Sequence, residues 1–180
     1  MQPREGFPAS SADIEVVSAD VLPSRLRVEK RRSEALVRLT NGSLVNGCFF
    51  VAGGSARHAG PERIGDLLNG SQGFVPFEQR FDAGMRTVLY NRAHIVTVTL
   101  SEDEASRDPG YVVAPKHDVS LRLSTGETVD GTVRVYQPEG HDRVSDWARE
   151  PEMFRYVESH SATLLVNTAH IVEISESPEP

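Results

Sequence analysis

The sequence predicts a mainly β protein built from two copies of one unit, and three observations lead to that prediction. Residues 91–98 (NRAHIVTV) return as residues 167–174 (NTAHIVEI), with the Asn, Ala, His, Ile and Val positions identical. Apolar runs rich in Val, Leu, Ile and Phe are separated by Gly and Asn turn residues, as in antiparallel sheets. A glycine interrupts the second of these runs in each copy, at Gly47 and Gly131. A repeat of about 80 residues indicates two small units in tandem.

The first copy opens with a predicted hairpin. A strand over residues 35–40 is followed by Asn41-Gly42 and by a return strand over residues 44–51. Asn-Gly between two β-rich runs is typical of a type I′ turn, which needs positive φ at both central residues. Gly47 inside the return strand indicates a bulge or a sharp bend, as at the corner of a small barrel.

A short helix is predicted over residues 61–70. Ile64, Leu67 and Leu68 fall on one face at i, i+3 and i+4. Arg63 and Asp66 stand at i, i+3 and are interpreted as a surface ion pair, with docking of a partner as the alternative. Strands over residues 74–77, 87–90 and 95–98 complete the copy.

The second copy follows the same path. A strand and turn at residues 119–126 match the first hairpin at an offset of 84, and a helix over residues 142–149, with Asp142 as N-cap, matches at 80. The closing strands at 163–166 and 171–174 match at 76. Loops absorb such differences in length and strands do not. The predicted division is a disordered N-terminus (1–12), a first β-barrel repeat (13–100), an acidic linker (101–112), a second β-barrel repeat (113–175) and a tail (176–180).

Each copy resembles the Sm-like branch of the SH3-like small barrels. The resemblance is carried by Leu39-Thr40-Asn41-Gly42 with Gly47, by Leu123-Ser124-Thr125-Gly126 with Gly131, and by the closing strand after each Asn-x-Ala-His turn. It implies two homologous small Sm-like/SH3-like barrels in tandem, each with one short inserted helix. The helix lies in the middle of each copy, whereas that family usually places one before the first strand. The family's RNA-contacting turn is Arg-Gly, which this chain lacks. The whole chain also resembles tandem-repeat bacterial proteins, which implies no activity.

Composition restricts the function classes. A net charge of −7 disfavours nonspecific binding of nucleic acid, which depends on neutralising phosphates. Cys48 is the only cysteine, so no intrachain disulfide forms. We expect a cytoplasmic protein, because no apolar run approaches the roughly 18 residues of a membrane-spanning helix and the N-terminus lacks a signal-peptide core.

Two sets of residues are candidates for binding. The first is a basic strip within residues 25–32. A charged edge strand explains this strip, and the alternative is an anion site. Arg27 and Arg31 with Asn41-Gly42-Ser43 resemble part of the PilZ motif, which implies cyclic di-GMP binding, although Gly47 stands one residue late. The residues of the strip that could hold an anion are Arg25, Arg27, Arg31 and Arg32.

The second set is the repeated turn, Asn91 with His94 and Asn167 with His170. Asn and His at tight turns commonly bond backbone groups, and a polar pocket is the alternative. The six histidines show no metal-ligand spacing, and no nucleophile elbow, phosphate loop or dinucleotide fingerprint occurs. We therefore expect no metal, no cofactor and no enzyme activity, but a protein-interaction or assembly module that binds a partner or itself. A cyclic-dinucleotide or other anion-binding regulator is the alternative, and an RNA-binding Sm-like protein is the third.

Overall fold

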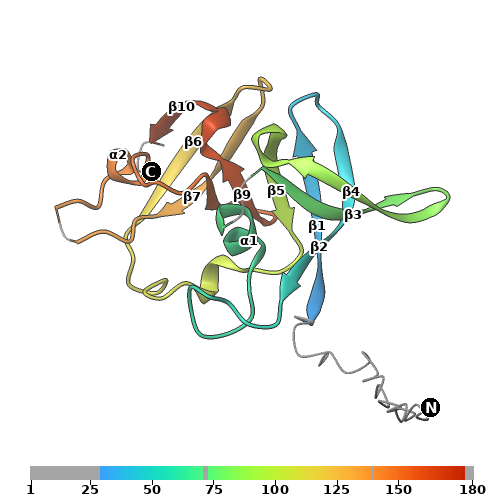
Figure 1. Ribbon diagram of the computed structural model, residues 1–180. Helices are drawn as coiled ribbons and strands as arrows, with labels where there is room; N and C mark the ends of the chain where they lie inside the picture. The colour runs from blue at the N-terminus through green and yellow to red at the C-terminus, as the bar shows by residue number, and fades with distance from the viewer. Residues whose placement is uncertain (1–28, 71–72, 139, 177–180) are drawn as a thin grey trace, which may run out of the picture.

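The computed structural model describes residues 29–70, 73–138 and 140–176. Within them, ten antiparallel strands form one sheet in the order β10-β6-β7-β8-β9-β5-β1-β2-β3-β4, so the prediction of a mainly β protein is confirmed (Figure 1). The predicted disordered N-terminus and Arg25 and Arg27 lie outside the described residues. The strands are β1 (Lys30–Leu39), β2 (Leu44–Ala52), β3 (Phe74–Phe81), β4 (Gly84–Asn91), β5 (Ile95–Leu100), β6 (Lys116–Leu123), β7 (Thr128–Arg134), β8 (Phe154–Glu158), β9 (Thr163–Asn167) and β10 (Ile171–Glu176).

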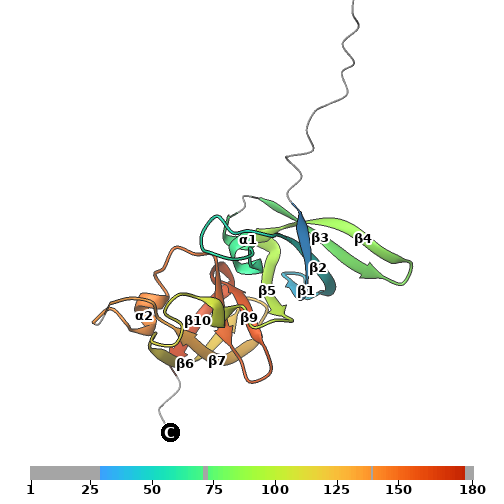
Figure 2. The same cartoon turned by 90° about the horizontal axis from the view of Figure 1, so that it is seen from below.

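The two halves of the chain contribute their strands in the same order. Residues 30–100 give β5-β1-β2-β3-β4, and residues 116–176 give β10-β6-β7-β8-β9. The halves meet where β5 pairs with β9 in the register Thr97↔Val166, Val98↔Leu165 and Thr99↔Leu164. The edges of the sheet are therefore β4 and β10. Figures 1 and 2 show these two strands at opposite sides of the molecule, with β3 and β4 projecting as a long hairpin.

The glycines inside the second strand of each half allow another strand to come close. A Cβ on Gly47 would lie 2.0 Å from the carbonyl oxygen of Glu78 in β3. A Cβ on Gly131 would lie 2.7 Å from the carbonyl oxygen of Glu158 in β8. Only glycine fits at such distances, so each half needs it where its second and third strands cross.

The hairpin turns differ from the prediction. Gly42 has φ +83° and Gly126 has φ +85°, but no described residue other than glycine has positive φ. Asn41 therefore does not adopt the conformation of a type I′ turn. The N–H of Gly42 donates to the carbonyl of Leu39, and the N–H of Leu39 donates to the carbonyl of Ser43. This geometry is a turn followed by a glycine in the left-handed region, which closes a hairpin as effectively.

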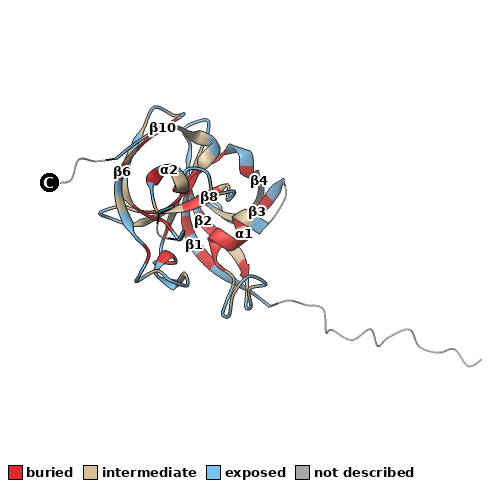
Figure 3. Cartoon of the chain, turned by 90° about the vertical axis from the view of Figure 1, so that its left-hand side faces the viewer, coloured by how far each residue is buried: buried red, intermediate tan, exposed pale blue. Residues whose placement is uncertain are grey.

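Two short α-helices lie near the predicted positions, α1 (Ile64–Gly70) and α2 (Val144–Trp147). The second has a single turn, and its N-cap is Arg143 instead of the predicted Asp142. In α1, Ile64 and Leu68 are buried, as the periodicity predicts, and Figure 3 shows most of this helix buried. Short 3-10 turns occupy Arg92–His94, Ala105–Arg107 and Thr168–His170.

Each half has its own apolar core, and the cores exchange residues across the β5–β9 junction. The core beneath the first half includes Phe154 and Leu165 from the second. The core beneath the second half includes Val96 from the first. The junction between the halves is therefore packed like an interior.

Candidate functional site

The described part of the basic strip is paired with carboxylates. Arg32 lies 2.8 Å from Glu78 and Arg31 lies 3.5 Å from Glu102. As neighbours in β1, the two arginines point to opposite faces of the sheet. The structure therefore does not bring Arg31 and Arg32 together into one fork for a phosphate.

The repeated turns share one internal geometry. The side-chain oxygen of Asn91 accepts from the N–H of Ala93 at 3.0 Å, and that of Asn167 accepts from the N–H of Ala169 at 3.0 Å. His94 Nδ1 lies 3.2 Å from the hydroxyl of Thr40. His170 Nδ1 lies 2.9 Å from that of Ser124. These bonds fix the turns between the last two strands of each half.

The second turn also joins the two halves, which the sequence did not reveal. The amide nitrogen of Asn167 donates to the carbonyl of Ile95 at 2.8 Å, and the Asn167 side chain is fully buried. His170 Nε2 lies 2.8 Å from the carbonyl of Ala93. Because a carbonyl only accepts, Nε2 must carry a proton, and in the neutral imidazole Nδ1 then accepts from the serine hydroxyl. Among the described residues, Asn91 and His94 have no equivalent contact, because no strand lies beyond β4.

The two free edges of the sheet carry apolar side chains whose counterparts are buried at the internal junction. Leu89 of β4 is 63% exposed, whereas its counterpart Leu165 of β9 is 0% exposed. Val172 of β10 is 63% exposed, whereas its counterpart Val96 of β5 is 0% exposed. Phe74, at the start of β3, is likewise 61% exposed. Each edge is therefore one side of a junction like that between β5 and β9, without its partner among the described residues.

A hollow of about 240 Å³ lies beside β10. Its walls include Ala148 next to α2 and Ile171 and Ile174 of β10. The corresponding residues of the first half, Leu68, Ile95 and Val98, share one core cluster with Phe154 and Leu165. The hollow thus lies where the second half would receive an apolar strand, as the first half receives β9.

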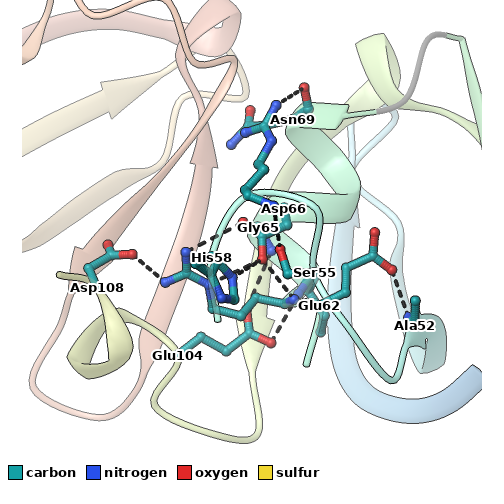
Figure 4. Close-up of polar contacts among 12 residues, drawn as sticks. Ala52, Ser55, His58, Glu62, Gly65, Asp66, Asn69, Glu104 and Asp108 are labelled. Carbon is teal, nitrogen blue, oxygen red and sulfur yellow. Dashed lines mark hydrogen bonds and ion pairs between the residues drawn. The ribbon is translucent and has the colours of Figure 1, made fainter. Parts of the chain in front are cut away.

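A buried polar cluster attaches α1 to the segment that follows β5 (Figure 4). The carboxylate of Glu104 accepts from the backbone N–H groups of Ile64 at 3.0 Å and Gly65 at 3.4 Å, and from the hydroxyl of Tyr156 at 3.2 Å. Glu104 is 1% exposed, and this burial raises its pKa. The segment predicted as an acidic linker therefore supplies the acceptor for the first turn of a helix.

The pair interpreted as a surface ion pair is buried in the first half. Arg63 donates to Asp66 and to Asp108, and His58 Nε2 lies 2.6 Å from Asp66. Burial alone would raise the pKa of Asp66, but the hydrogen bonds from Arg63 and His58 outweigh it and lower that pKa. The counterpart Asp146 is more exposed and accepts from the backbone N–H of Arg143. The interpretation of Arg63 and Asp66 as a surface pair was wrong, because Asp108 and the loop with His58 cover it.

Next to this cluster lies a cavity of about 530 Å³, lined by both halves of the chain.

Cys48 is separate from this cavity, in β2, and burial raises the pKa of its thiol. Within residues 29–70, 73–138 and 140–176, no group of three or more His, Cys, Asp and Glu residues is arranged to hold a metal ion. None of the helices in the described part of the chain is long and apolar enough to cross a membrane.

Comparisons with family models, with curated proteins and with solved structures give no match to this chain.

Proposed function

We propose that the chain is a non-enzymatic assembly module that associates head to tail with further copies of itself. One observation carries the proposal. Leu89 and Val172 stand exposed at the two edges of the sheet, while Leu165 and Val96, their counterparts, are fully buried where the two halves meet. An exposed sheet edge with apolar side chains is a template for another strand. The chain contains both sides of such a junction.

The internal junction supplies the register of the proposed contact. Moving the β5–β9 pairing by 76 residues gives Glu173↔Tyr90, Ile174↔Leu89 and Ser175↔Val88 between β10 of one copy and β4 of the next. In this arrangement Leu89 would enter the hollow beside β10, whose walls are described above.

Asn91 and His94 of the first turn carry side-chain donors without a partner among the described residues, and these donors fit the same contact. His94 Nε2 would donate to the carbonyl of Ala169 of the next copy, as His170 Nε2 does to Ala93 within the chain. The amide of Asn91 would donate to the carbonyl of Ile171, as Asn167 does to Ile95.

The proposal includes the finer description of the fold, two Sm-like/SH3-like units in tandem. Its support is the shared strand order of the halves, the matching close approach at Gly47 and Gly131, and the shared Asn-x-Ala-His turn.

Because the edges β4 and β10 differ, the contact is heterologous and repeats from copy to copy. It closes into a ring where the rotation permits and otherwise continues as a filament.

The test measures the molar mass of the full chain by light scattering over a range of concentrations. The wild type is expected to exceed the monomer mass. Leu89→Lys places a charge at the centre of the proposed pairing and is expected to elute as a monomer. Leu44→Lys is the matched control, because Leu44 is 53% exposed but lies in β2, away from both edges. A strictly monomeric wild type would refute the proposal.

A further inference from the structure

The cavity beside α1 contains a buried arginine that lacks an ionic partner. Arg155 of β8 lines the cavity and is 5% exposed. Its guanidinium donates to the backbone carbonyls of Glu150 and Glu152 and stacks over Trp147, with 4.9 Å to the ring centroid. Its Nη1 has no hydrogen-bond partner among the described residues. Burying a cationic donor without a hydrogen-bond partner costs free energy, so an acceptor is expected beside it.

The other charged groups of the cavity are largely neutralised by each other. Arg63 is paired with Asp66 and Asp108, and Arg134 is paired with Glu158. These contacts occupy three of the five carboxylates in the lining and two of its four arginines. They leave Arg155 and the more exposed Arg57, which donates only to a backbone carbonyl, as cations without a carboxylate partner among the described residues.

The remaining carboxylates limit the charge of a ligand. Glu150 and Glu152 lie near enough to Arg155 to act on it electrostatically. Burial raises the pKa of Glu150, and the nearby Arg155 acts in the opposite direction. A single negative charge is accommodated beside such groups better than a phosphate dianion.

Much of the rest of the lining is apolar, beside the amides of Asn69 and Gln137. Ala105, Pro109, Pro151 and Phe154 contribute carbon surface, and Tyr136 adds an aromatic ring. A volume of about 530 Å³ falls in the range of small-molecule sites, which combine mostly apolar walls with a few polar anchors.

We propose that this cavity binds a small organic acid, with one carboxylate on Arg155 and an apolar body against the proline and aromatic walls. The cavity lies within a single chain, so the site does not depend on self-association. The carboxylate would bind the Arg155 guanidinium through a charge-assisted hydrogen bond. Because Nη1 is itself buried, the side chain would turn slightly toward the cavity to bring Nη1 into this bond.

Trp147 provides a direct reporter, because it is the only tryptophan of the chain and lies against Arg155. The full-length Leu89→Lys variant is titrated with acetate, butyrate, octanoate and 3-phenylpropionate while tryptophan fluorescence and heat are recorded. We expect one molecule of 3-phenylpropionate bound per chain, with affinity rising from acetate to the larger acids. Its amide, 3-phenylpropionamide, is expected to bind at least about tenfold more weakly, since it lacks the charge.

Two further arms decide the role of Arg155. Arg155→Met is expected to weaken binding at least about tenfold, whereas Arg122→Met, at an exposed position of β6 outside the cavity, is expected to leave it unchanged. The comparison of acid with amide uses unaltered Arg155 and stands if Arg155→Met fails to fold. Equal binding of acid and amide, preferential binding of inorganic phosphate, or no binding of any acid below about 1 mM would overturn the proposal.

Discussion

Blocking one sheet edge at a time tests the direction of the proposed assembly. Leu89→Lys blocks β4 and leaves β10 intact, and Val172→Lys blocks β10 and leaves β4 intact. Both positions are 63% exposed, and their counterparts are 0% exposed, so about two-thirds of each side chain's surface would be buried on association. Full burial of such a side chain stabilises by about 1.5–3 kcal/mol, so its loss costs ~1–2 kcal/mol. Desolvating the new ammonium adds to this, and a total of ~2 kcal/mol weakens a junction about 30-fold.

The assay is light scattering or sedimentation of each variant alone and of an equimolar mixture. Each variant alone is expected to be monomeric at concentrations where the wild type assembles. The mixture is expected to form a one-to-one dimer, because β10 of the Leu89→Lys chain meets β4 of the Val172→Lys chain. Assembly by one variant alone would indicate a contact between identical edges and would refute the head-to-tail reasoning. So would a mixture that stays monomeric.

Three further predictions concern stability, each measured by urea unfolding in a monomeric background. Gly47→Ala is expected to lose about 3 kcal/mol or more, because its Cβ meets the backbone of β3, whereas Gly54→Ala, with open space around it, is expected to change stability by less than about 0.5 kcal/mol. Asn167→Ala is expected to cost about 1–3 kcal/mol more than Asn91→Ala, because only Asn167 satisfies carbonyls of the other half; equal losses would contradict that role. The pKa of Glu104 is raised from 4.5, so the folded state holds this proton more tightly than the unfolded state. The contribution of Glu104 to the free energy of unfolding therefore falls as pH rises above 4.5. Glu104→Gln is expected to remove this pH dependence, and an unchanged pH dependence would contradict the reasoning.

The features that could be predicted from the sequence are those fixed by local periodicity and by duplication. Alternating apolar residues located the strands, and i, i+3, i+4 spacing located α1 with Ile64 and Leu68 buried. The glycines at 47 and 131 were predicted as points of bending, and in the structure they allow the third strand to approach. Asn41 misled the turn prediction, because the hairpin closes with positive φ at Gly42 alone.

The features that could not be predicted depend on contacts between distant segments. Arg63 and Asp66 have the spacing of a surface pair, but Asp108, 45 residues from Arg63, and the loop that carries His58 cover them. Arg155 has the sequence context of an ordinary charged strand residue, and only the fold places it against Trp147 and in the wall of a cavity that α1 and the segment after β5 also line. The exposure of Leu89 could not be predicted from the sequence either, because its sequence context repeats that of Leu165, which is fully buried.

The two junctions of the proposed assembly are related but unequal. Within the chain, the side chain of Asn69 bonds both backbone groups of Phe154, at 2.8 and 2.9 Å. The counterpart of Asn69 is Arg149, which lacks the paired donor and acceptor for this contact. The contact between chains is thus expected to be weaker than the one within the chain and to be reversible. The counterpart of Arg155 is Val75, so a cavity formed between chains would lack the buried cation. If both proposals hold, duplication has left one junction to hold an organic acid and the other to join copies.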